Sequence, residues 1–173
     1  MKSTFEFSLE IARQAGALIA EKRRNEPLER NFKGGIEIVT QADIAADDLI
    51  SAAIRAAYPS HQILSEESSP DLGRVEDIEG PLWIIDPIDG TVNYAHGLNQ
   101  SGVSIAFVDG GLIQHGVVFN PFSDELFAAQ RGGGLVGGAH YASAKGGVVS
   151  LTRTIAREFG PQGIHVVHSL LDG

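Results

Sequence analysis

Apolar residues recur along the chain at two different intervals, which predict helices in its first third and strands after that. In MKSTFEFSLEIARQAGALIAEKRR they recur every three or four positions, as expected of an amphipathic helix. The same spacing predicts a second helix over about residues 42–57. Both helices begin with the spacing of a capping box: Ser3 with Glu6, and Thr40 with Asp43.

The remaining pattern up to about residue 130 is typical of strands. NEPLERNFKGGIEIVT predicts two short strands with a turn at Gly34-Gly35, and HQILS and PLWIID predict two further strands. SGVSIAFV and LIQHGVVF are joined by Asp109-Gly110-Gly111, a strong hairpin signal, and LFAAQ follows. We therefore expect a layered α+β domain, with two helices packed on a mainly antiparallel sheet.

Composition narrows the partners of this chain. Its 173 residues carry 22 acidic and 13 basic side chains, and the net charge of -9 argues against nucleic acid or an anionic membrane. The chain contains no cysteine, which fits a cytoplasmic protein, and no apolar run long enough to span a membrane. An acidic protein that handles anionic substrates needs cations to mediate, so a metal-dependent function becomes plausible.

The densest chemistry lies where two predicted strands end in carboxylates. Glu66 follows the first strand, while Asp86 and Asp89 end the second. Such carboxylates repel one another unless cations neutralise them, and hard oxygen ligands suit Mg²⁺. The N–H groups of Gly90 and Thr91 could hold phosphate oxygens. A capped turn with solvated carboxylates is the alternative interpretation of the short D-P-x-D-G pattern.

The longer pattern resembles a known family. SEES and WIIDPIDGTVNYAHG, with EIVTQAD upstream, are similar to the inositol monophosphatase family of Mg²⁺-dependent, lithium-sensitive phosphatases. The resemblance covers roughly residues 5–134. It implies in-line hydrolysis of a phosphomonoester, with an inositol or sugar phosphate as substrate.

The resemblance also implies roles for individual residues. Glu66, Asp86 and the Ile88 carbonyl would bind a first Mg²⁺, and Asp86 and Asp89 a second. Catalysis and substrate binding would involve three further residues, Asp43, Gly90 and Thr91. Thr91 would activate the attacking water together with Glu66, and would contact the phosphate together with Gly90. Asp43, counted among the catalytic residues, would lie near a third, looser metal site.

The family pattern stops after Gly134. Members of the family have a further metal-binding aspartate in a Trp-Asp motif, whereas the single Trp here is Trp83 and the last aspartate is Asp172 in LLDG. The expectation is a half domain over residues 1–134 with weak activity or none. A glycine-rich seam and a separate helix–strand unit over residues 135–173 would complete the fold.

That tail resembles a different family. YASAKGGVVSLTRTIAREFGPQGIHVVHSLLDG, within residues 139–173, is similar to the Tyr-Lys helix and following strand of short-chain dehydrogenases, with Tyr141 and Lys145 as the pair. No G-x-G-x-x-G loop opens a helix, so packing explains the tail better than NAD(P) chemistry. A chimera follows, and the exposed sheet of a half domain favours a homodimer. A non-catalytic chimera and an NAD(P)-dependent oxidoreductase both stay open as alternatives to a phosphatase.

Overall fold

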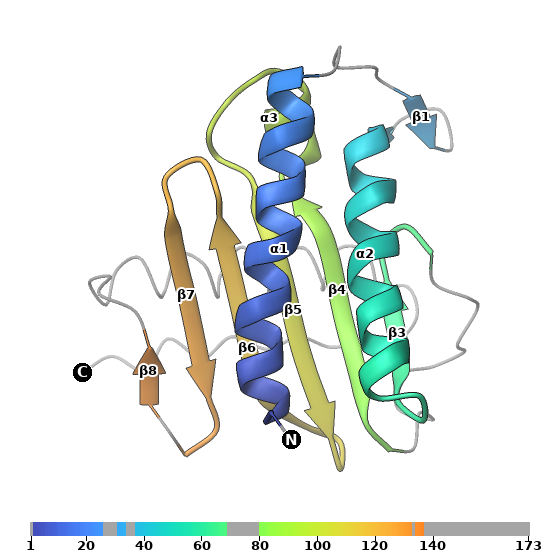
Figure 1. The fold of residues 1–173 in the computed structure, drawn as a ribbon, viewed down its shortest axis with the longest axis vertical. Coiled ribbons are helices and arrows are strands. Elements are labelled where there is room, and N and C mark those ends of the chain that lie inside the picture. Colours follow the sequence, from blue (N-terminus) through green and yellow to red (C-terminus); the bar gives the residue numbers. More distant parts are fainter. Residues whose placement is uncertain (1, 26–30, 34–36, 69–79, 133, 137–173) are drawn as a thin grey trace.

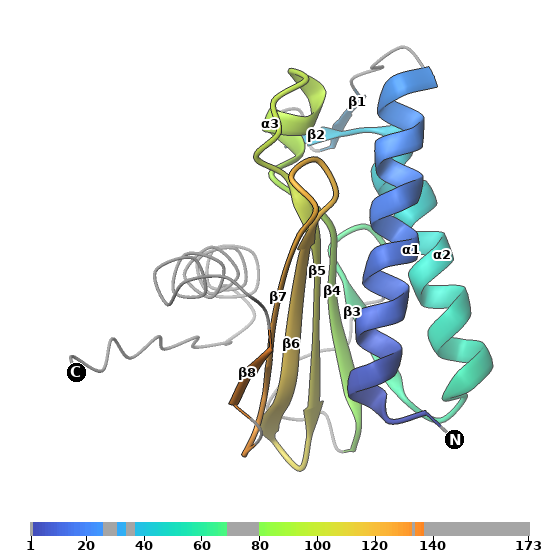
Figure 2. The ribbon, with the colours of Figure 1, turned by 60° about the vertical axis from the view of Figure 1, so that its left-hand side comes forward.

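Two long helices pack against one face of a mainly antiparallel sheet in the computed structural model of this chain (Figure 1). The structure describes residues 2–25, 31–33, 37–68, 80–132 and 134–136. Turning the molecule shows both helices on the same side of the sheet (Figure 2). This arrangement confirms the predicted α+β class. Within the described residues no helix combines the length and apolar character needed to cross a bilayer.

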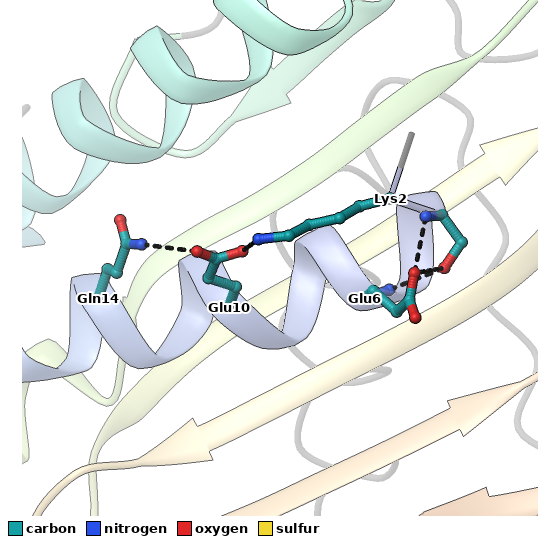
Figure 3. Close-up of polar contacts among 5 residues, drawn as sticks. Lys2, Glu6, Glu10 and Gln14 are labelled. Carbon is teal, nitrogen blue, oxygen red and sulfur yellow. Dashed lines mark hydrogen bonds and ion pairs between the residues drawn. The ribbon is translucent and has the colours of Figure 1, made fainter.

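The two long helices begin close to where their capping patterns predict. The described residues form α1 Thr4–Asn25, α2 Gln41–Ala57 and the short α3 Thr91–Ala95. At the start of α1 the Ser3 N–H donates to Glu6 Oε2 at 2.9 Å, and the Glu6 N–H donates back to Ser3 Oγ at 3.2 Å. Figure 3 shows this reciprocal pair, with Lys2 and Gln14 both reaching Glu10 further along the exposed side of the helix. The exposed contacts of Lys2 and Gln14 with Glu10 contribute little to stability, whereas the capping box determines where the helix starts.

The strands among the described residues form a six-stranded main sheet and a separate two-stranded sheet. In the two-stranded sheet, β1 Asn31–Lys33 pairs antiparallel with β2 Glu37–Val39. The main sheet has the order β3-β4-β5-β6-β7-β8. Its strands are β3 Gln62–Ser65, β4 Leu82–Asp89, β5 Gly102–Asp109, β6 Leu112–Asn120, β7 Glu125–Gln130 and β8 Gly134–Val136. The β3–β4 pair is parallel and the other pairs are antiparallel.

The register of the central strands builds the core between the sheet and the helices. Trp83 pairs with Phe107, and Ile85 with Ile105, so these side chains share one face of β4 and β5. They pack against the apolar faces of both long helices, which supply Phe5, Ile11, Ala12, Ala15, Ile19, Ala42, Ala46, Ile50 and Ile54. Burial of this apolar surface is the main force that holds α1 and α2 on the sheet.

Most predicted elements of the first 130 residues are confirmed. The second helix starts one residue earlier than expected, and the hairpin at Gly110 and Gly111 closes with positive φ at both glycines. The α3 helix and the β8 strand were not predicted. The turn at Gly34-Gly35 and the tail beyond residue 136 lie outside the described residues.

A buried histidine links α1 to the middle of the sheet. His115 on β6 is 2% exposed, and its Nε2 lies 2.7 Å from the hydroxyl of Ser8 on α1. Its ring stacks on Phe107 and meets Phe5 edge-on, so few polar groups surround it. Burial lowers the pKa of His115 from 6.5 to about 4, because the imidazolium would lose its hydration here.

This depressed pKa predicts a loss of stability in mild acid. Below pH 6.5 the unfolded chain binds a proton at His115 that the folded chain refuses until about pH 4. The free energy of unfolding should therefore fall across this window, by up to about 3 kcal/mol, since one pKa unit is worth about 1.4 kcal/mol. Urea unfolding of the wild type and His115→Gln at several pH values measures the difference in slope. His96→Gln, at an exposed histidine, should keep the wild-type slope, and an unchanged slope in His115→Gln would contradict the assignment.

Candidate functional site

The parallel pairing of β3 with β4 brings two of the predicted carboxylates to the same edge of the sheet. Ser65 pairs with Ile85, and the Glu66 N–H donates to the Ile85 carbonyl at 3.2 Å. Glu66 therefore follows β3 directly beside Asp86 on β4. Asp86 is only 7% exposed, while Glu66 is half-buried. Two neighbouring carboxylates in a partly buried position repel each other, and a bound cation would relieve that repulsion.

Beyond Asp86, the chain bends into a short helix. The register of β4 against β5 shifts between Asp86 and Asp89, and Gly90 follows with φ 87° and ψ 40°, in the left-handed region. The α3 helix starts at Thr91, whose hydroxyl lies 3.0 Å from the Ile88 carbonyl. This irregular stretch places four predicted site residues within a single turn of chain: Ile88, Asp89, Gly90 and Thr91.

A further predicted site residue, Asp43, lies on α2. Asp43 is 1% exposed, and its Oδ1 lies 3.1 Å from the hydroxyl of Thr91. Its Oδ2 accepts hydrogen bonds from the N–H of Thr40, at 2.8 Å, and from the Thr40 hydroxyl. The capping box that starts α2 thus also orients a carboxylate towards Thr91.

The surroundings of Asp43 raise its pKa above the ordinary value of an aspartate. Burial raises the pKa of Asp43, because the charged carboxylate loses water, and hydrogen bonds from Thr40 and Thr91 offset part of that rise. A carboxylate with a raised pKa is a better proton acceptor than a solvated one at the same distance. The Thr91 hydroxyl has one proton, so it donates either to Asp43 or to the Ile88 carbonyl at any moment.

The described residues include the types of ligand that a metal ion needs, but they are not arranged as a metal site. Carboxylate and carbonyl oxygens are the ligands that Mg²⁺ prefers, and Glu66, Asp86 and Ile88 supply them at this edge. Among the residues that the structure describes, however, no group of three or more Asp, Glu, His or Cys side chains is arranged to hold a metal. The roles of Glu66, Asp86, Ile88 and Asp89 as ligands remain predictions.

Two polar residues near the site escaped the sequence pattern. Asp47 and Ser65 are both buried, and the Ser65 hydroxyl donates to Asp47 Oδ1. The sequence does contain a pattern that could have drawn attention to Asp47. On α2, Asp43, Asp47 and Ser51 recur every four residues on a side that is otherwise apolar. Tyr141 and Lys145 lie outside the described residues, so the predicted dehydrogenase-like tail stays a prediction.

Comparison with known proteins identifies one family. The sequence model of the inositol monophosphatase family matches residues 1–162, which extends past Gly134, where the predicted resemblance ended. Nus factor SuhB of Pasteurella multocida is 39% identical over 135 residues, covering 78% of this chain and 49% of that protein. Inositol monophosphatase 1 of Solanum lycopersicum is 37% identical over 127 residues, covering 73% and 46%.

Solved structures agree with the sequence matches. The IMPase of Thermotoga maritima superposes with a TM-score of 0.68 at 32% identity, covering 78% of this chain and 51% of that one. The chain spans about half the length of the curated relatives it matches.

The turn at Gly90 leaves no room for a side chain, which predicts the effect of a substitution there. A Cβ at Gly90 would lie 2.8 Å from the Gln100 carbonyl oxygen, in addition to the strain of positive φ. Gly90→Ala should therefore lower the free energy of unfolding by about 2–4 kcal/mol, measured by urea denaturation.

Gly97→Ala is the matched control for that substitution. Gly97 also has positive φ, at 74°, but a Cβ there meets nothing within 4 Å. It should cost only the backbone term of about 1–2 kcal/mol. Equal losses in the two variants would show that the Gln100 contact carries no weight.

Proposed function

The chain belongs to the inositol monophosphatase family, and we propose that it is a Mg²⁺-dependent phosphomonoesterase acting on inositol or sugar phosphates. The observation that carries this proposal is the hydrogen bond between Asp43 and Thr91, formed where Glu66 and Asp86 lie on neighbouring strands. A buried carboxylate, a hydroxyl and two further carboxylates at one edge are the groups that hydrolysis of a phosphate ester needs. The name of the Solanum lycopersicum relative, inositol monophosphatase 1, supports an inositol phosphate as the substrate class.

Glu66, Asp86, Asp89 and the Ile88 carbonyl are the residues that would hold Mg²⁺. The ion, when bound, would supply positive charge that stabilises the transferring phosphoryl group. The N–H groups of Gly90 and Thr91 are assigned to the phosphate, since the first N–H groups of a helix have no acceptor within it.

Thr91 and Asp43 would move the proton of the attacking water. When the Thr91 hydroxyl donates to Asp43 Oδ1, its oxygen is free to accept a hydrogen bond from water. The water proton would pass to Thr91 as the Thr91 proton passes to Asp43. The water oxygen then bonds to phosphorus, the ester P–O bond breaks, and inorganic phosphate and an alcohol are the products. Glu66 would orient the same water from the neighbouring strand.

Expectations about partners and location rest on composition, and the expectation about assembly rests on the half domain. The net charge of -9 argues against nucleic acid and membrane as partners, and the absence of cysteine fits a cytoplasmic protein with a small phosphate ester as partner. The homodimer is proposed because a half domain would leave a face or edge of its sheet exposed.

Metal binding tests the ligand assignment directly. Calorimetric titration of the chain with Mg²⁺ should give a binding isotherm, and Asp86→Asn should weaken the affinity by about tenfold or more, because the variant removes a charged ligand. Asp109→Asn is the matched control, since it removes the same charge from the exposed last residue of β5. The absence of any isotherm for the wild type, or equal affinities for the two variants, would sink the metal assignment.

Hydrolysis tests the roles of Thr91 and Asp43. With inositol monophosphate or a sugar phosphate, Thr91→Val should lower kcat by about 10²–10⁴-fold, since it removes the hydroxyl at nearly constant shape, whereas Thr91→Ser should retain most activity. Activity should fall as pH drops through the raised pKa of Asp43, because the protonated acid accepts no proton. Asp43→Asn should abolish that dependence together with most turnover. A chain that folds and binds Mg²⁺ but hydrolyses no phosphomonoester would support the non-catalytic alternative.

A further inference from the structure

The α2 helix carries a buried polar stripe towards the strand ends. Asp43, Asp47 and Ser51 lie four residues apart and are 1%, 2% and 2% exposed. Residues with this spacing share one face of a helix. Asp43 contacts Thr91, but Asp47 has no part in the chemistry proposed above. A buried carboxylate is costly unless it is hydrogen-bonded, so its retention calls for an explanation.

The hydrogen bonds of Asp47 connect α2 to the last residue of β3. Its Oδ1 accepts from the Ser65 hydroxyl at 2.5 Å and from the Ser51 hydroxyl at 3.4 Å. Both donors in the described part of the chain are serine hydroxyls. Only the bond from Ser65 crosses between elements, because Ser51 lies on α2 itself. A hydrogen bond to a charged acceptor is shorter and stronger than a neutral one.

Ser65 also holds the chain that follows it. While its hydroxyl donates to Asp47, its Oγ accepts the N–H of Glu67 at 3.4 Å. Glu66, between these two residues, donates its own N–H to the Ile85 carbonyl on β4. The backbone on both sides of Glu66 is therefore tied to Asp47 through Ser65, and that of Glu66 itself to β4.

We propose that Asp47 is a positioning residue that fixes Glu66 for metal and water binding by holding Ser65. The assignment of Glu66 to the metal rests on the proposed function, whereas the link from Asp47 to Glu66 rests on the contacts alone. The same helix then orients both sides of the site: Asp43 orients Thr91, and Asp47 orients the end of β3.

Two variants break the link and two controls leave it intact. Asp47→Ala removes the acceptor and Ser65→Ala removes the donor. Asp48→Ala removes an exposed carboxylate one residue along the same helix, and Ser51→Ala removes the other donor without affecting β3. Asp47→Asn keeps an acceptor oxygen of the same shape and should restore most of the wild-type behaviour.

Amide hydrogen exchange, followed by NMR, measures the positioning effect without any metal. Asp47→Ala and Ser65→Ala should speed exchange at Glu66 and Glu67 by about tenfold relative to Ile105, a core amide of β5. The controls should leave this ratio unchanged. A purely structural role would speed exchange at all three amides alike, and that outcome, or an unchanged ratio, would overturn the proposal.

Mg²⁺ calorimetry on the same variants separates this inference from the proposed function. Both link-breaking variants should weaken Mg²⁺ binding by about 10–100-fold, as is typical when a residue that orients a ligand is lost. If the wild type binds no Mg²⁺, the proposed function fails, while the exchange ratio still decides whether Asp47 fixes Glu66. If the ratio rises but Mg²⁺ affinity stays unchanged, Asp47 does not position a metal ligand and the proposal is overturned.

Discussion

The parallel pairing of β3 with β4 is the constraint on which the candidate site depends. Side chains alternate between the two faces of a strand, so a slip of one residue would turn Ser65 away from α2 and break its bond to Asp47. The same slip would move Glu66 away from its place beside Asp86. Apolar packing secures this register, because Leu64 and Trp83 on these strands are almost fully buried. The core thereby determines the position of the carboxylates.

Packing α2 against the sheet buries two carboxylates, which lowers stability but serves the candidate site. Two carboxylates, Asp43 and Asp47, are buried on a face that an apolar residue could occupy more cheaply. Asp43 accepts hydrogen bonds from the N–H and hydroxyl of Thr40 and from the hydroxyl of Thr91. Asp47 accepts hydrogen bonds from the hydroxyls of two serines. Local departures from an apolar pattern are expected where a protein trades stability for function.

The sequence predicted those parts of the fold that depend on neighbouring residues. Capping boxes at Ser3 and Thr40 and the glycine turn of the β5–β6 hairpin need only local interactions, and the structure has all three. The α3 helix escaped prediction because its five residues are too few for a periodic signal and its start depends on Gly90. The role of Asp47 escaped because its partner Ser65 is 18 residues away, and only the parallel register brings them together.

The candidate site shows the same division between local and distant information. The motif around Asp86 identifies the residue types, but it does not show that Asp43, 48 residues before Thr91, shares a hydrogen bond with it. The resemblance implies that Asp43 lies near a loosely bound metal, which stays a prediction, and the structure adds its hydrogen bond to the Thr91 hydroxyl. Since Asp43 and Asp47 project from one rigid helix one turn apart, a displacement of α2 would disturb Thr91 and Glu66 together. The two halves of the proposed chemistry are therefore coupled through the packing of a single helix.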